Sequence, residues 1–265
     1  MLEVAANNNI TICVLMCGGI GSRINASSNI SENRMEKPLI LLNNKPLIEH
    51  IIVTILNAKI QFKIFAAVSS NTKETERFIR DKYSNKIIIL KTQGKGYSDD
   101  FTNIISYFKK ESYIKEQGKQ YTRNNLLLNG QEPRNKIEYS KILFLPIDLP
   151  LISTKTIERI LDLKQETPLI SIVIDKKVIT ENGFFPTSYI VKIDEKDYCY
   201  TGITVVSLPL FSNENPNLIG DQIEEEPIIF NDPELAFNIN TMNDLERTKE
   251  YISKRIKKLK KLETD

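Results

Sequence analysis

Short apolar runs alternate with amphipathic segments along most of the chain. The runs are rich in β-branched residues, which is typical of strands buried on both faces of a sheet. We predict strands at residues 10–16, 64–68, 86–91, 141–147 and 169–174. Apolar residues recur at helical spacing in residues 46–56, 73–83, 97–109 and 153–161. Strands that alternate with helices predict a mainly parallel α/β fold, a Rossmann-like three-layer sandwich.

Turn and cap residues indicate where several elements begin. We expect a short strand at 39–42, a turn at Asn43-Asn44, and Pro46 in the first turn of the helix that follows. Ser153 is expected to cap the helix after residue 153. Thr241 with Asp244 resembles a capping box and predicts the start of the last helix.

Two regions break the alternation of strands and helices. Residues 111–139 are polar and charged apart from three leucines, so they are predicted as an insertion, with a hairpin and a homodimer contact as open alternatives. Short extended pieces dominate residues 190–230, with turns expected at 194–195 and 201–202. We therefore expect one domain over residues 10–252, followed by a basic helical tail at 253–265.

The basic tail allows two interpretations. A basic amphipathic helix can bind an anionic membrane surface. The alternative, which we favour, is a terminal helix that packs through Ile252, Ile256 and Leu259 and exposes its lysines to solvent.

Composition narrows the possible partners. The 36 basic and 34 acidic residues nearly cancel, which argues against a dedicated nucleic-acid binder. Three cysteines are too few and wrongly spaced for a zinc site or a disulfide framework, so a reducing cytoplasm is expected. No apolar run approaches the roughly 20 residues that span a bilayer. Residues 1–9 lack the pattern of a signal peptide.

A glycine-rich turn follows the first strand. Its sequence is Gly18-Gly19-Ile20-Gly21-Ser22-Arg23, and a polar loop then leads to Lys37-Pro38. Glycines let the backbone approach a bound group, and a row of N–H groups in such a turn suits phosphate oxygens. The two cations add positive charge, and Pro38 restricts the backbone of Lys37. A plain tight turn is the alternative to this triphosphate site.

Spacing excludes two other phosphate motifs. The dinucleotide fingerprint would need glycine at Ile24. A Walker loop ending at Gly94-Lys95 would need glycine at Ile89 and Ser or Thr at Gly96.

Several polar loops should meet at one edge of the sheet, because ligands of parallel sheets bind outside the carboxyl ends of the strands. These loops are 18–23, 69–72, 92–97 and the one that begins at Asp148. Asp148 directly follows a buried strand, where a charge needs a cation or hydrogen-bond donors. A Mg²⁺ ligand and a helix cap are the two candidate roles of Asp148, although Ser153 already suits the cap.

The glycine turn together with Lys37-Pro38-Leu39 resembles the N-terminal signature of GT-A-like α/β nucleotidylyltransferases. Residues 92–97, 201–206 and 237–241 look most like the archaeal guanylyltransferases that act on adenosylcobinamide phosphate in cobalamin biosynthesis. The molybdenum-cofactor nucleotidylyltransferases are a more distant resemblance. The likeness covers residues 10–110 and 140–252, and the loop between Arg23 and Lys37 is longer than the family usually has.

The resemblance implies transfer of GMP from GTP to a phosphorylated acceptor. It implies that Arg23, Lys37 and Asp148 are catalytic, with Mg²⁺ on Asp148. The implied nucleotide-binding residues are Gly18, Gly19, Gly21, Ser22, Ser69, Thr92, Gly94, Lys95 and Gly96. An ordinary β-to-α turn is the alternative for residues 92–97.

Gly202 and Asn240 are the candidates for the acceptor side. Gly202 suits a pocket wall or a β-turn. Asn240 could reach the metal or, with Asn238, close a turn before Thr241. His50, the only histidine, is expected on a solvated helix face, and an acceptor phosphate needs no base at neutral pH. A sugar phosphate or molybdenum-cofactor acceptor, and a non-catalytic nucleotide-binding module, remain alternative functions.

Overall fold

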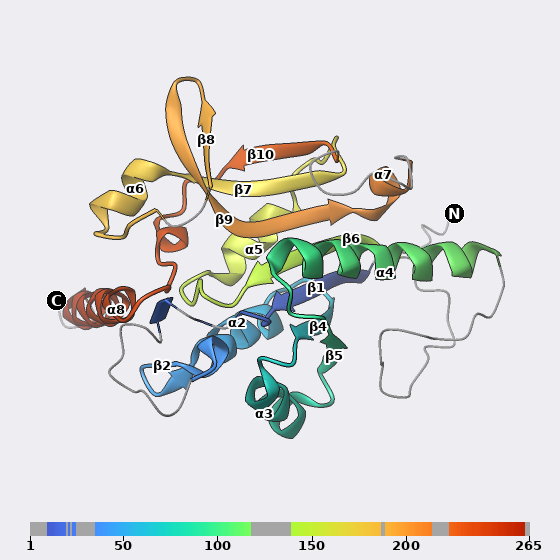
Figure 1. The fold of residues 1–265 in the computed structure, drawn as a ribbon. Helices are drawn as coiled ribbons and strands as arrows, with labels where there is room; N and C mark the ends of the chain where they lie inside the picture. The colour runs from blue at the N-terminus through green and yellow to red at the C-terminus, as the bar shows by residue number, and fades with distance from the viewer. Residues whose placement is uncertain are drawn as a thin grey trace, which may run out of the picture.

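A central sheet with helices on both faces forms the body of the molecule (Figure 1). The computed structural model describes residues 10–19, 21, 23–24, 35–117, 139–186, 189–213 and 223–262. The strands of the sheet are β1 (Ile10–Met16), β4 (Phe62–Val68), β5 (Ile87–Lys91), β6 (Tyr139–Pro146), β7 (Leu169–Asp175), β8 (Ile190–Ile193), β9 (Lys196–Ser207) and β10 (Glu225–Ile229). A separate hairpin pairs β2 (Leu41–Leu42) with β3 (Lys45–Pro46).

The sheet is mixed but mostly parallel. Its order is β10-β7-β9-β6-β1-β4-β5, and β8 pairs with β9. The pairs β1–β4, β1–β6, β4–β5 and β7–β10 are parallel. Strand β9 lies between β6 and β7 and runs antiparallel to both of them and to β8.

Alternating side chains of the strands enter two cores. Cys13 and Leu15 of β1 face a core shared with α2 (Leu47–Leu56), α3 (Lys73–Tyr83) and α5 (Thr154–Leu161). Ile12 and Val14 face a second core with α4 (Tyr97–Gln117). This two-sided burial explains the continuous apolar runs and confirms the predicted three-layer α/β class. The remaining helices are α6 (Lys176–Glu181), α7 (Leu208–Asn213), α8 (Met242–Leu262), and the 3₁₀ turns η1 (Lys37–Leu39) and η3 (Pro233–Ala236).

Several element boundaries differ from the prediction. Helix α4 continues to Gln117, so the predicted insertion begins as helix, and residues 118–138 lie outside the described part of the chain. The expected strand at 39–42 begins instead with the 3₁₀ turn η1. Pro46 is the residue before α2 rather than part of its first turn.

The turn predicted at 201–202 is wrong, because Gly202 lies inside the continuous strand β9. Its φ of +82° falls where the β7–β9 register shifts between Ser171 and Val173. A glycine at a β-bulge carries the same sequence signal as a glycine in a turn, which is why the pattern misled the prediction.

Helix α8 begins with the predicted capping box. Asp244 Oδ2 accepts a hydrogen bond from Thr241 N at 2.8 Å, and Thr241 Oγ1 accepts one from Asp244 N at 3.1 Å. Ile252 packs on the body, but Ile256 and Leu259 are 47% and 54% exposed, so the predicted packing of these two residues is wrong. Residues 253–262 continue α8 without a break. Within the described ranges, no helix has the length and apolarity needed to cross a membrane.

Candidate active site

Four loops leave the carboxyl ends of neighbouring strands at one edge of the sheet. Backbone hydrogen bonds extend the pairing past the strand ends, from Cys17 N to Ala67 O at 2.9 Å and from Thr92 N to Val68 O at 2.8 Å. The glycine turn, the loop after β4 and the loop after β5 are therefore held side by side. The fourth loop, after β6, carries Asp148.

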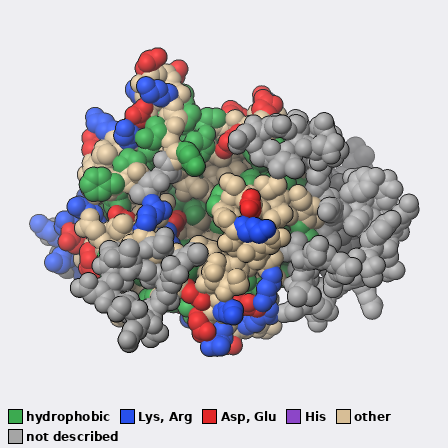
Figure 2. Space-filling view, in the orientation of Figure 1, with side chains coloured by type: hydrophobic (Ala, Val, Ile, Leu, Met, Phe, Trp, Pro, Cys, Tyr) green, Lys and Arg blue, Asp and Glu red, His purple; other side chains and the backbone are tan. Residues whose placement is uncertain are grey.

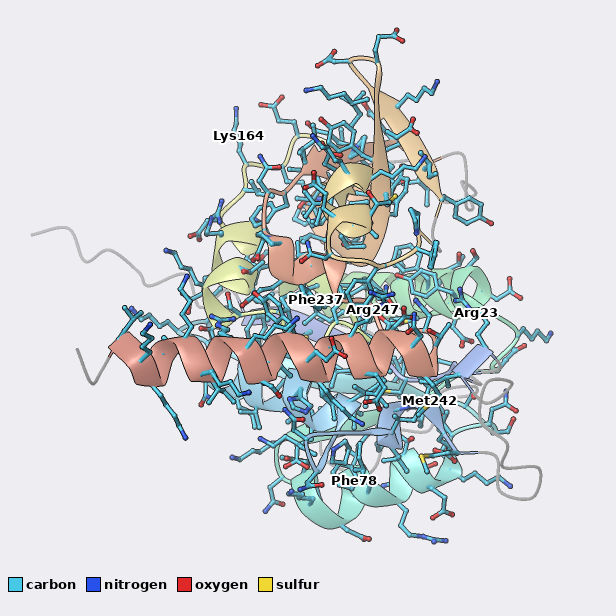
Figure 3. All side chains as sticks on the ribbon, turned by 90° about the vertical axis from the view of Figure 1, so that its left-hand side faces the viewer. Arg23, Phe78, Lys164, Phe237, Met242 and Arg247 are labelled. Carbon is cyan, nitrogen blue, oxygen red and sulfur yellow. The ribbon has the colours of Figure 1, made fainter. Side chains whose placement is uncertain are left out.

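Lys37 connects the glycine-turn side of this edge with the loop after β6 and the segment before α8. Its ammonium lies 2.6 Å from Asp148 Oδ2 and 3.0 Å from Asn240 Oδ1, both within hydrogen-bond distance. Arg23 Nη2 donates to the same Asn240 oxygen at 3.1 Å, so one amide oxygen accepts from both cations. The side chains of Lys37 and Asp148 are only 12% and 17% exposed. The structure thus brings all three predicted catalytic residues together, and Figure 3 shows Arg23 near the first turn of α8.

Asn240 is oriented by the capping box of α8. Its backbone N–H donates to Asp244 Oδ2 at 3.0 Å, and its side-chain amide donates to Asn238 Oδ1 at 2.6 Å. Ile239 N donates to the backbone oxygen of Asp148 at 2.9 Å, which ties this segment to the loop after β6. Asn238 and Asn240 are therefore hydrogen-bonded to each other before Thr241, as the turn-closing interpretation expects, and Asn240 also contacts Arg23 and Lys37.

The carboxylate of Asp148 fits a divalent cation. Ser153 Oγ accepts from Thr156 N at 3.1 Å and caps α5, so Asp148 does not cap that helix. Asp148 Oδ1 is buried and has no hydrogen-bond partner among the described residues, although a buried carboxylate oxygen normally has one. Mg²⁺ commonly uses one or two carboxylates together with substrate phosphates. Among the residues that the structure describes, no cluster of three or more His, Cys, Asp and Glu residues forms an all-protein metal site.

The loop over residues 92–97 is fixed by Asp100, which the sequence did not single out. This carboxylate is 5% exposed and accepts from Thr92 Oγ1 at 3.0 Å and from Gly94 N at 3.2 Å. A Cβ placed on Gly18 would come 3.2 Å from Asp100 Oδ2 and 3.9 Å from Ser69 Oγ. The structure therefore places Gly18, Ser69, Thr92 and Gly94 around one point. An acidic residue in the first turn of the following helix was the available sequence signal for Asp100.

The other residues predicted to bind the nucleotide have fewer contacts with this group of loops, or lie outside the described residues. A Cβ on Gly19 would meet no atom of the described residues within 4 Å. Lys95 and Gly96 are exposed at the end of their loop. Ser22 lies outside the described residues.

Gly202 belongs to the far wall of the same edge. The hydroxyl of Tyr97 donates to Gly202 O at 3.4 Å, which links the loop after β5 to β9. A Cβ on Gly202 would lie 3.3 Å from Pro146 Cγ at the end of β6. The structure thus excludes the β-turn interpretation of Gly202 and leaves it in a strand at the site.

A shallow hollow extends this wall toward α6. The hollow is lined by Ile174, Ile179, Phe184, Phe185, Pro186, Tyr200, Thr201, Leu235, Ala236 and Asn238. Phe185 and Tyr189 are 76% and 89% exposed near it, and Figure 2 shows hydrophobic side chains at the surface over α6 and the β8–β9 hairpin. Asn238 connects the hollow to Asn240 through their 2.6 Å hydrogen bond.

Comparisons with known proteins identify the class. Residues 12–119 match the nucleotidyl transferase family model. The chain superimposes with a TM-score of 0.56 on CMP:2-keto-3-deoxy-manno-octonic acid synthetase complexed with CTP, at 13% identity over 93% of this chain and 100% of that one. It also matches 4-diphosphocytidyl-2C-methyl-D-erythritol synthase from Anaerococcus prevotii, with a TM-score of 0.56, 9% identity, and coverage of 93% and 97%. At such identities these two structures show the shared fold alone.

The family match, with the curated relative described next, supports a nucleotidyltransferase, the enzyme class expected from the glycine turn together with Lys37-Pro38-Leu39. Among curated proteins, the chain is similar to the adenosylcobinamide-phosphate guanylyltransferase of Methanocaldococcus jannaschii. The two are 29% identical over 247 residues, which cover 91% of this chain and 97% of the relative. The resemblance to the archaeal guanylyltransferases is thereby confirmed.

Proposed function

We propose that this protein transfers GMP from GTP to adenosylcobinamide phosphate and releases pyrophosphate. The observation that carries the reaction class is the meeting of the glycine turn, Arg23, Lys37 and Asp148 at one edge of the sheet. The guanine base and the acceptor rest on similarity to the relative, which extends over almost its entire length.

The reaction needs charge neutralisation and positioning more than proton transfer. An acceptor phosphate oxygen attacks the α-phosphorus of GTP, a new P–O bond forms, and the bond to the β-phosphate oxygen breaks. The nucleophile is already ionised at neutral pH, so no general base is required. The backbone of Gly18 and Gly19 would hold the triphosphate. Arg23 and Lys37 would offset the charge that grows on the leaving pyrophosphate.

Asp148 would hold Mg²⁺ through Oδ1, while Asp148 Oδ2 stays paired with Lys37. The ion, when bound, would supply positive charge to the α-phosphate and the leaving group. Asp148 and Asn240 both accept hydrogen bonds from the ammonium of Lys37 and so keep it in place. The lysine in turn neutralises the charge of the buried Asp148 carboxylate.

The surface around the hollow beside Asn238 is our proposed contact for the bulky part of the acceptor. The hollow itself is too small to enclose a large organic group, so the exposed rings of Phe185 and Tyr189 would provide the apolar contact, and Asn238 leads to the polar cluster. Gly202, beside Pro146, lies on the strand between Thr201 of the hollow and Tyr97 of the loop after β5.

The cellular setting and the assembly are also proposals. The three free cysteines are buried, as suits a reducing compartment, and we place the reaction in the cytoplasm. A homodimer remains a prediction, and size-exclusion chromatography with light scattering would test it.

A thermal-shift panel of GTP, ATP, CTP and UTP with Mg²⁺ tests the nucleotide. A ligand at a hundred times its Kd adds about 2.7 kcal/mol to the free energy of unfolding. Each kcal/mol raises the unfolding midpoint of a chain this size by roughly 2–4 °C. We expect a shift of several degrees with GTP and a smaller one with the others. Equal shifts would contradict the guanine assignment, and no shift would contradict the nucleotide site.

The acceptor is tested separately, by pyrophosphate release from GTP with adenosylcobinamide phosphate, a sugar phosphate or the molybdenum cofactor. We expect release with the first compound. Release with either of the others alone would replace the proposed acceptor and keep the reaction class.

A further inference from the structure

Glu36, which directly precedes Lys37, makes a clamp with a helix distant in sequence. Its carboxylate accepts hydrogen bonds from Glu74 N at 2.9 Å, from Thr75 N at 2.7 Å and from Thr75 Oγ1 at 2.6 Å. All three donors belong to the first turn of α3. One side chain from the loop before η1 thus caps a helix that begins more than 35 residues later.

The clamp exists because α3 lacks a cap of its own. The first N–H groups of a helix have no partner within the helix. Thr72, the residue before α3, makes no such bond, because its hydroxyl contacts Ser69 N at 3.0 Å and Ser69 O at 3.4 Å. Glu36 supplies the missing acceptors, and its negative charge also lies at the positive end of the helix dipole.

The same residue fixes the backbone from which Lys37 projects. Glu36 O accepts from Leu39 N at 2.9 Å and begins the turn η1, in which Pro38 restricts the chain further. On the other side of Lys37, a Cβ placed on Gly21 would come 2.9 Å from Lys37 Cβ. The backbone of Lys37 is therefore confined between the clamp on α3 and the glycine turn.

The clamp also connects two loops of the nucleotide site. The segment from Ser69 to Thr72 leads directly into α3, and a Cβ on Gly94 would lie 2.7 Å from Ser69 Cβ. A shift of α3 would thus move Ser69 against the loop over residues 92–97, and release of Glu36 would move Lys37.

We infer that Glu36 is a positioning residue, which holds Lys37 over the triphosphate by capping α3. This inference rests on the proposed function, because it assumes that Lys37 acts on the departing pyrophosphate. Glu36 itself does not touch substrate. Its effect on turnover passes through the lysine beside it.

Steady-state kinetics of Glu36→Ala, Glu36→Gln and Lys37→Ala test the inference. Lys37→Ala should lower kcat on the order of 10²–10³-fold, as for one preorganised charge-stabilising group. Glu36→Ala should lower kcat about 10- to 100-fold with a smaller change in KM for GTP, since small misplacements have effects of this size. Glu36→Gln keeps one acceptor oxygen and should fall between Glu36→Ala and wild type.

The double variant Glu36→Ala/Lys37→Ala separates positioning from stability. If Glu36 acts through Lys37, the double variant should be no more than about 2-fold slower than Lys37→Ala, because the two effects then share one step. The matched control is Glu76→Gln on the same helix, whose carboxylate contacts Arg80 and Lys91, each at 2.8 Å. It should lower the unfolding midpoint and leave kcat near wild type.

Each outcome decides one claim. Multiplicative effects in the double variant, or an unchanged kcat in both Glu36 variants, would overturn the positioning role. A normal kcat in Lys37→Ala would overturn the proposed role of Lys37 instead. If Glu36→Ala does not fold, Glu36→Gln and its double variant with Lys37→Ala give the same comparison.

Discussion

The two walls of the site differ in the groups that they present. The N-terminal wall, from β1 to α4, supplies backbone N–H groups and the cations Arg23 and Lys37. The C-terminal wall, from β6 to α8, supplies oxygen acceptors, Asp148 and Asn240. Strands are parallel throughout the first wall, whereas the second is interrupted by the antiparallel strand β9.

This difference shows how the two cations of the site are oriented. The cations come from the short helical stretch at 23–24 and from the 3₁₀ turn η1, which alone would not fix long side chains. The acceptors come from the turn that follows β6 and from the segment that leads into the capped helix α8. Lys37 and Arg23 are therefore oriented by the opposite wall, at distances of 2.6–3.1 Å. Each wall is incomplete without the other.

Asp148→Asn should have the largest effect and breaks the link between the walls directly. Asn keeps the shape and one acceptor oxygen but removes the charge that pairs with Lys37 and would hold Mg²⁺. We expect a fold close to that of wild type, because Lys37 still contacts Asn240. Turnover should fall on the order of 10²–10³-fold, measured as pyrophosphate release at saturating Mg²⁺.

Asp175→Asn is the matched control for this substitution. Asp175 also ends a strand of the C-terminal wall, but its side chain caps α6 by accepting from Lys177 N at 2.7 Å. Asn is as good a cap as Asp, so stability and turnover should both stay near wild type. Near-normal turnover in Asp148→Asn as well would remove the metal role from Asp148.

Some features of the two walls were predictable from the sequence, and others were not. Helix α3 has the predicted bounds, Lys73–Tyr83, because its apolar spacing and flanking loop are local signals. Gly202 was placed in a turn because the pairing that makes it a bulge in β9 involves β7, about 30 residues away. The clamp by Glu36 and the fixing of residues 92–97 by Asp100 depend on contacts between elements. The local sequence pattern predicts helices, strands and candidate site residues. The hydrogen-bond partners of those side chains can be identified only once the fold is known.

Two glycine substitutions, one in each wall, compare the walls further and should have smaller effects than Asp148→Asn. Gly94 and Gly202 both have positive φ, +67° and +82°, which costs a residue with a Cβ about 1–3 kcal/mol. A Cβ on Gly94 would also lie 2.7 Å from Ser69 Cβ, whereas one on Gly202 would meet Pro146 at 3.3 Å. Gly94→Ala should therefore destabilise the protein by about 2–4 kcal/mol and Gly202→Ala by about 1–2 kcal/mol, measured by urea unfolding.

Ligand binding separates the two glycines further. Gly94→Ala should weaken the thermal shift given by GTP, since it displaces the loop after β5 against Ser69. Gly202→Ala should leave that shift intact and raise KM for the acceptor. The reverse pattern would show that the N-terminal wall binds the acceptor and the C-terminal wall binds GTP, contrary to our assignment.

The smallest expected effect concerns His50, in the N-terminal wall but away from the cations. Its Nε2 lies 3.0 Å from Leu42 O, and the ring is partly buried rather than solvated as the sequence suggested. Burial lowers the pKa of His50, the Leu42 carbonyl opposes this change, Lys45 adds to it, and Glu49 opposes it. The folded state thus binds its proton less readily than the unfolded state, whose histidine titrates near 6.5.

The sign of the pH dependence follows from this difference. The stabilising contribution of neutral His50 is present above the unfolded pKa and is lost as the pH falls below about 6.5 toward the lower pKa of the folded state. Urea unfolding at pH 7.5, 6.5 and 5.5 should show wild type losing stability relative to His50→Gln as the pH falls. The ratio of the two kcat values should stay constant over the same range, because the proposed chemistry uses no imidazole. If instead that ratio changes with pH while relative stability does not, a proton-transfer step involving the N-terminal wall would have to be added to the reaction.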